Sequence, residues 1–183
     1  VVIGVSMARR KSVDTLVRPL LDAGQTIPAF VYLIPCLALF GPTRFTGIVA
    51  SIAYAAPVAI KLVADGVRGV SPTTMEAVQS TGASTMQQIR KVQLPMAKAS
   101  LVLATNQGLL FVLAMAVISG MVGAGALGYD VVLGSFRSEE WGKGAAAGLS
   151  IVLLGIMLDR IARRAAEAAP AGSQRRRLSN RGI

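Results

Sequence analysis

The chain has 183 residues, of which 53% are hydrophobic and only 15% are charged, and its mean hydropathy is +0.58. A soluble domain usually carries about 25% charged residues, and the uncharged run Ala99–Tyr129 is too long for a soluble core helix. We therefore expect an integral membrane protein. A single cysteine, Cys36, and no histidine exclude an internal disulfide and a Cys/His zinc or catalytic site, so no cofactor or metal is expected. The net charge of +10 is attributed to membrane orientation rather than to nucleic-acid binding.

Four stretches have the length and composition of membrane spans, which need about 20 mostly apolar residues. The expected spans cover residues 23–40, 45–64, 100–122 and 143–160. The last has an uncharged centre of only Gly144–Leu158, but Trp141 and Arg160 flank it as interfacial anchors. The segment Val1–Met7 is apolar but too short to span, and is interpreted as the cut end of an earlier helix or as an unanchored terminus. No signal peptide is expected, because the basic cluster follows this segment instead of preceding it.

The fold class predicted from these spans is an all-α, polytopic membrane helix bundle. A membrane domain over residues 1–161 is followed by a basic tail over 162–183, which is small, polar and expected to be disordered in the cytoplasm. If the segment before Ala23 is inside, sixteen of the 19 Lys and Arg residues fall on inside loops. Only Arg44, Arg137 and Lys143 fall outside. This bias predicts that the long loop over 65–99 and the C-terminus are cytoplasmic.

The long inside loop carries signals for two short helices. Ser71 before Pro72 suits an N-cap with proline in the first helical position, and Thr73-x-x-Glu76 offers an additional capping pair. Ser84-x-x-Gln87 is a second capping box, so the two helices are expected to meet at Gly82-Ala83. The loop is either an ordinary linker or a docking element for a cytoplasmic partner. The residues alone favour neither alternative.

Two stretches of the sequence resemble a known family. MEAVQSTGASTMQQIRKVQLP is similar to the EAA loop of ABC-importer permeases: Glu76 and Ala77 match, Gly82 has the required spacing, and Leu94-Pro95 closes the motif. Val78 and Val92 depart from the pattern, and both changes are small and apolar. Upstream, QTIPAFVYLIP over residues 25–35 resembles the glycine betaine/proline branch of that family.

The resemblance implies a type I importer core of five spans with the first one truncated, in a bacterial inner membrane. It implies a permease subunit that carries glycine betaine, proline or a related osmoprotectant. Its implied partners are an ABC ATP-binding subunit, a second permease subunit and an extracytoplasmic solute-binding protein. ATP would be hydrolysed on the separate subunit, so this chain is not expected to be an enzyme. The implied ATPase-coupling residues are Glu76, Ala77, Gly82, Ala83, Leu94 and Pro95.

Other motifs were weighed and given lesser roles. Gly123–Gly128 matches G-x-G-x-x-G, but it follows an expected span instead of a strand and is interpreted as a glycine-rich outer turn. The polar triplet Thr105-Asn106-Gln107 is expected either to form interhelical hydrogen bonds, which is slightly favoured, or to line the pathway. Tyr32 and Tyr54 are candidates for cation–π contact with a quaternary ammonium group, against the more common packing role.

Alternative functions remain at this stage. The first keeps the family and changes the cargo to another small solute. A second is an ion-coupled secondary transporter, which would need acidic residues within the spans; residues 23–40, 45–64, 100–122 and the uncharged centre 144–158 contain none. A membrane enzyme is third, and it lacks a catalytic constellation.

Overall fold

The computed structural model describes residues 1–168, and every regular element in this part of the chain is helical. The predicted all-α bundle is confirmed. The elements are α1 (Val2–Arg9), α2 (Lys11–Thr26), α3 (Ala29–Phe40), α4 (Arg44–Arg68), α5 (Pro72–Ser80), α6 (Thr85–Gln88), the π-helical turn η1 (Ile89–Gln93), α7 (Leu94–Met96), α8 (Lys98–Met121), α9 (Ala126–Phe136), the 3-10 turn η2 (Ser138–Glu140) and α10 (Trp141–Ala168).

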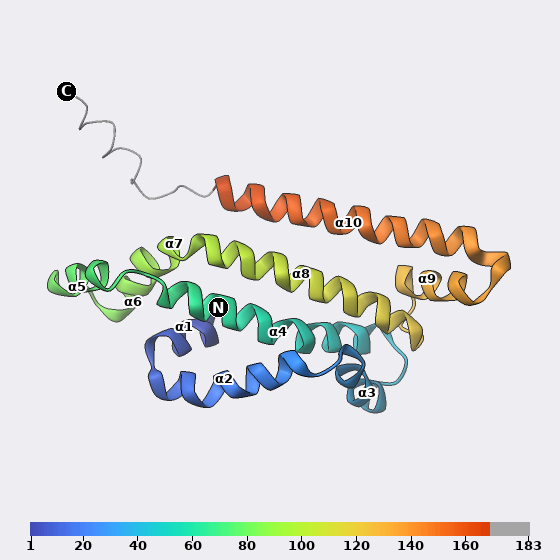
Figure 1. Cartoon of the computed structure of the whole chain (residues 1–183), viewed down its shortest axis with the longest axis horizontal. Coiled ribbons are helices and arrows are strands. Elements are labelled where there is room, and N and C mark those ends of the chain that lie inside the picture. Colours follow the sequence, from blue (N-terminus) through green and yellow to red (C-terminus); the bar gives the residue numbers. More distant parts are fainter. Residues whose placement is uncertain (169–183) are drawn as a thin grey trace, which may run out of the picture.

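The centre of the molecule is the pair α4 and α8, which lie side by side along the long axis (Figure 1). Small residues let the two backbones approach closely. A Cβ atom built on Gly66 would lie 2.2 Å from the Ser100 Cβ, and one on Gly47 would lie 3.1 Å from the Ser119 Cβ. Close approach of this kind is how helices associate in lipid, where the hydrophobic effect does not drive them together. Polar and small residues in α4 and α8 therefore determine the packing of the bundle.

The expected span over 23–40 is not one straight helix. It breaks between α2 and α3, which meet at an angle of 96°. The cause is Pro28, whose ring disfavours a helical conformation at the preceding residue, and Ile27 is accordingly extended with φ −72° and ψ 127°. The Tyr32 hydroxyl donates to the Gly24 carbonyl oxygen at 2.6 Å and joins the two sides of the bend. The absence of charge over residues 23–40 predicts a single span, and it carries no information about a change in direction.

Three described helices are long and apolar enough to cross a membrane: Arg44–Arg68, Lys98–Met121 and Ser138–Arg164. The bent pair α2 and α3 makes a fourth candidate if it counts as one span. The helix α10 lies along α8 on the side away from α1 and α2 (Figure 1). It continues to Ala168, past Ile161 where the membrane domain was expected to end. The rest of the expected tail, residues 169–183, lies outside the described residues.

The glycine-rich segment after α8 forms a tight turn, as predicted. Gly123 and Gly125 have φ values of +86° and +75°, in the left-handed region that glycine adopts without strain. A Cβ on Gly120 would lie 2.1 Å from the backbone of Gly128, so α9 folds back directly against the end of α8. These glycines permit a sharp reversal and close helix packing, which agrees with the rejection of a nucleotide-binding role.

Candidate functional site

The loop between α4 and α8 forms one end of the molecule, where α5 and α6 project beyond the bundle (Figure 1). The α5 helix begins as predicted, because the Ser71 Oγ accepts a hydrogen bond from the Thr74 backbone N–H at 3.2 Å and Pro72 is the first helical residue. Thr73 therefore lies inside the helix instead of capping it. Glu76 and Ala77 are both exposed on α5. Their side chains are free to meet a partner.

Gly82 and Ala83 join α5 to α6, as the sequence predicted. Gly82 has φ +72°, and a Cβ built on it would have nothing within 4 Å. Glycine is thus required here by backbone conformation and not by lack of space. The predicted capping box at the start of α6 is confirmed: the Gln87 N–H donates to the Ser84 Oγ, and the Ser84 N–H donates to the Gln87 Oε1.

A π-helical turn, η1, follows α6, and nothing in the sequence predicted it. Its register is shown by the Leu94 N–H, which donates to the Ile89 carbonyl oxygen five residues earlier. The side chains of Gln88 and Gln93 are buried, each with 7% exposure. Buried amides require hydrogen-bond partners, because an unsatisfied polar group inside a protein is costly. Periodicity had assigned this stretch to an ordinary α-helix.

The partner of both glutamines is Arg9, at the end of α1. Its Nη1 donates to the Gln93 Oε1 at 2.8 Å, and its Nη2 donates to the Gln88 Oε1 at 3.1 Å. The Gln88 side-chain nitrogen in turn donates to the Ala83 carbonyl oxygen at 2.8 Å. Arg9 had been counted only as a topology signal. Its hydrogen bonds connect residues about 80 positions apart, which local patterns cannot reveal.

Apolar contacts fasten the same side of the loop to the bundle. Ile89 and Leu94 pack against a buried cluster formed by α1, α4 and α8, in which Val5, Val63 and Val67 are the largest members. Pro95, one of the predicted coupling residues, is exposed. The loop therefore has an anchored side, made by Gln88, Ile89, Gln93 and Leu94, and an exposed side that carries Glu76 and Ala77.

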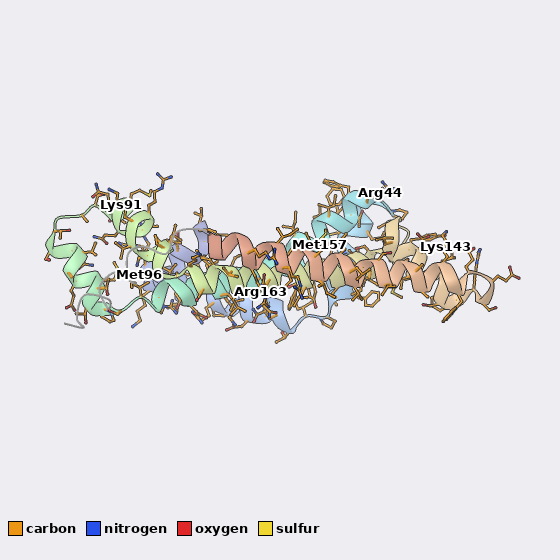
Figure 2. The ribbon with its side chains drawn as sticks, turned by 90° about the horizontal axis from the view of Figure 1, so that it is seen from above. Arg44, Lys91, Met96, Lys143, Met157 and Arg163 are labelled. Atoms are coloured by element: carbon orange, nitrogen blue, oxygen red, sulfur yellow. The ribbon has the colours of Figure 1, made fainter. Side chains whose placement is uncertain are left out.

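The exposed side is hollowed. A pocket of about 380 Å³ lies between α5, α6 and η1. Its lining residues are Val78, Thr81, Gly82, Ala83, Gln87, Lys91 and Val92. From Ser71 to Lys98, Glu76 is the single acidic residue of the sequence, against Arg90, Lys91 and Lys98. The exposed side is thus a basic surface with a hollow of mixed polarity, and it lies at the opposite end from Arg44 and Lys143 (Figure 2).

Ion pairs hold α2 against the loop-proximal end of α4. The Arg18 guanidinium lies 2.7 Å from Asp65 and 3.2 Å from Asp14, and Arg68 lies 2.8 Å from Asp14. Arg68 also donates to the Met7 carbonyl oxygen at 3.3 Å, which ties α1 to the same place. These cations had been assigned only to orientation in the membrane. The structure gives them an additional role in packing.

The candidate pathway residues do not converge on one site. Tyr32 and Tyr54 lie with ring centroids 5.5 Å apart, and Tyr54 also lies 4.9 Å from Phe111. Thr105 donates to the Leu101 carbonyl oxygen of its own helix, and the Asn106 Oδ1 is buried with no hydrogen-bond partner among the described residues. The triplet's three side chains therefore point in different directions around α8.

Gln107 is the triplet member that faces a pocket. This pocket measures about 300 Å³ and lies between α2, α4 and α8. Its lining residues are Gln25, Val58, Lys61, Leu62, Asp65 and Gln107. The volume is at the small end of the range for ligand pockets. Polar groups of this kind are unsuited to lipid contact, which favours a position on a water-filled path or a subunit contact.

Comparison with known proteins agrees with this architecture. The family described as "Binding-protein-dependent transport system inner membrane component" matches residues 1–167. The chain is 42% identical over 159 residues to the glycine betaine/carnitine transport permease protein GbuB of Listeria monocytogenes, covering 87% of this chain and 56% of that protein. It is also 42% identical to the glycine betaine/proline betaine transport system permease protein ProW of Escherichia coli, covering 87% of this chain and 45% of that protein. The chain thus spans about half the length of these relatives.

A solved structure supports the fold. A chain of the MetNI methionine ABC transporter, in an inward-facing conformation, superposes with a TM-score of 0.76 at 21% identity. The match covers 91% of this chain and 83% of that one. At this level of identity the likeness concerns the fold alone.

Proposed function

Because the chain belongs to the family of binding-protein-dependent transport system inner membrane components, we propose that it is a permease subunit of an ATP-driven importer for glycine betaine or a similar osmoprotectant. The observation that carries the cargo assignment is the 42% identity to GbuB and ProW across 87% of the chain. Both names include glycine betaine, a small zwitterion with a quaternary ammonium group. The first alternative cargo is another small solute.

The proposed site of ATPase coupling is the exposed side of the loop, with Glu76, Ala77, Gly82 and Ala83 at its surface. Support comes from its accessibility, its basic charge and its hollow, which suit an acidic or polar partner surface. Leu94 lies on the anchored side and Pro95 at the exposed start of α7. ATP hydrolysis belongs to a separate subunit in this proposal, since the Walker pattern G-x-x-x-x-G-K-[ST] is absent between Val1 and Ile183.

Two further partners complete the proposed assembly. A second permease subunit would cover apolar surface such as that of α10. Only 6% of the apolar membrane-spanning segment of this helix is buried within the chain. A solute-binding protein would dock at the end of the molecule that carries Arg44 and Lys143 (Figure 2). The translocation pathway would lie between permease subunits, with Gln107 and its pocket among its walls.

The proposed orientation places the loop in the cytoplasm and the α9 end outside. It follows from the distribution of cations. In a Cys36→Ser background, single cysteines at the exposed positions Ser80 and Ser135 would be treated with a membrane-impermeant thiol reagent on intact spheroplasts. We expect labelling at position 135 alone. Labelling at position 80 alone would reverse the orientation.

The proposed function is tested by reconstituting the full permease with its ATP-binding subunit and binding protein in proteoliposomes. Uptake of radiolabelled glycine betaine should require ATP and the binding protein, and excess unlabelled betaine should compete for it. Competition by carnitine and proline would define the cargo range. Uptake that follows an ion gradient without ATP would instead support the secondary-transporter alternative and refute the importer.

A further inference from the structure

The contact between Arg9 and the loop depends on the unusual register of η1. In an α-helix of 3.6 residues per turn, residues five apart point about 140° away from each other. The π-helical hydrogen bond joins residues five apart, so it brings side chains at that spacing to nearly the same side. Gln88 immediately precedes the π turn, and Gln93, five residues later, is its last residue. Both can therefore present an oxygen to one guanidinium.

Arg9 fits this arrangement better than any other cationic side chain would. Its planar guanidinium donates through two nitrogens, to Gln93 at 2.8 Å and to Gln88 at 3.1 Å. A lysine ammonium is a single point of charge and does not have this fork. Hydrogen bonds from a charged donor are stronger than neutral ones. The contact is therefore one of the stronger polar links between the loop and the bundle.

The helix that carries Arg9 is itself fixed to α4. A Cβ on Gly4 would lie 2.8 Å from the Ile60 carbonyl oxygen and from Val63, so the two helices touch through their backbones. The Arg68 guanidinium donates to the Met7 carbonyl oxygen near the end of α1. A movement of the loop would thus pull on Arg9, and Arg9 would transfer it to α1 and α4.

We propose that Arg9, held by Gln88 and Gln93 across the π turn, is the positioning residue that transmits movement of the loop to the membrane helices. We call these three residues the Arg9 clamp. The inference rests on the proposed function, in which an ATP-binding subunit drives the loop. With the Arg9 clamp intact, loop and bundle move as one body. Without it, the loop follows the ATPase while α1 lags behind, and α4 receives the movement only through its own end and the apolar contacts of Ile89 and Leu94.

The decisive variant is Arg9→Ala, and Arg10→Ala is its matched control. Arg10 carries the same charge at the next position, but its side chain is exposed. In proteoliposomes with the ATP-binding subunit and the binding protein, the solute imported per ATP hydrolysed is measured. Loss of one charged hydrogen bond shifts an equilibrium about tenfold. We expect this ratio to fall at least about tenfold in Arg9→Ala and to stay at the wild-type value in Arg10→Ala.

Two further variants separate transmission from simple support of the fold. Arg9→Lys retains the charge but cannot donate through two nitrogens. The solute that it imports per ATP hydrolysed should therefore lie between the values for wild type and Arg9→Ala. Arg9→Ala combined with Gln93→Ala should be no worse than Arg9→Ala alone, because both remove the same link. If uptake and ATP hydrolysis fall in parallel together with the melting temperature, Arg9 only stabilises the fold and the proposal is wrong.

Hydrogen exchange provides a readout that does not depend on transport. In the detergent-purified permease, amides of residues 84–97 should exchange at least about tenfold faster in Arg9→Ala than in wild type, and Arg10→Ala should not change them. Unchanged exchange would overturn the Arg9 clamp whatever the cargo is. Absence of ATP-driven uptake by the wild-type complex would instead overturn the proposed function. A wild-type import ratio in Arg9→Ala would overturn this inference alone.

Discussion

Gly82 allows a sharp test of how the loop geometry is maintained. Its φ of +72° lies in the left-handed region, where a residue with a Cβ loses about 1–2 kcal/mol. A Cβ at this position has nothing within 4 Å, so Gly82→Ala introduces conformational strain without a steric clash. That cost lowers the population of the observed loop geometry by a factor of about 5–30. The expected result is a matching loss of transport with normal insertion, because Gly82 lies outside the long apolar helices.

A series of substitutions separates strain from bulk. Asparagine tolerates the left-handed region better than alanine does, so Gly82→Asn should transport more than Gly82→Ala. Gly82→Arg has the same backbone strain and also places a long cation beside Lys91, in the hollow that the partner is proposed to face. This variant should abolish transport. The matched control is Gly142→Ala, where a Cβ also has nothing within 4 Å but φ is not positive.

The assay is ATP-dependent betaine uptake per permease molecule in the membrane, with pull-down of the ATP-binding subunit from the same membranes. The expected order of uptake is wild type, Gly82→Asn, Gly82→Ala and then Gly82→Arg. Wild-type uptake by Gly82→Ala would show that the loop can leave the left-handed conformation without loss. Equal uptake by the alanine and asparagine variants would also contradict the strain argument.

Two other predictions concern the exposed side of the loop and the packing of α8. Glu76→Lys should insert normally but retain at least about tenfold less ATP-binding subunit in pull-downs, because the exposed Glu76 carboxylate is proposed to meet a cation within the otherwise polar partner surface, and the lysine would repel that cation. Normal pull-down would place the contact elsewhere. Gly120→Ala should lower the free energy of unfolding by about 1–3 kcal/mol, since its Cβ would lie 2.1 Å from the Gly128 backbone. Thermal unfolding in detergent measures this effect, and Gly142→Ala, which has open space, should be close to neutral.

Local signals were sufficient to predict much of the loop. The N-cap at Ser71, the capping box at Ser84 and the left-handed Gly82 each depend on residues within a few positions of one another. The apolar runs that became α4, α8 and α10 were likewise visible, because membrane spans are specified by length and composition. These features could be predicted since their causes are contained in short segments.

Features that depend on distant residues or on direction were not predictable. Hydropathy measures how apolar a segment is but not where it points, so the uncharged stretch over 23–40 predicts one span despite the 96° bend at Pro28. The π turn was missed because its stabilising partner, Arg9, lies about 80 residues away. The assignment of Arg9 to the inside loops stays a prediction, and it is compatible with the contacts of Arg9 because one residue can serve both roles.

The two sides of the loop suggest how it can accept a force without deforming. The exposed side is joined to the anchored side through the Ala83 carbonyl oxygen, which accepts a hydrogen bond from Gln88. On the anchored side, Ile89 and Leu94 are inserted among Val5, Val63 and Val67, and close-packed apolar groups of this kind resist compression. The helix α4 extends from Arg44 to Arg68 and carries a displacement at its loop end toward its far end, with Pro57 inside it as the point where the helix can bend. The bend between α2 and α3 is bridged by the hydrogen bond from the Tyr32 hydroxyl to the Gly24 carbonyl oxygen, and the Tyr32 ring also packs against Tyr54, so α3 is tied to both α2 and α4.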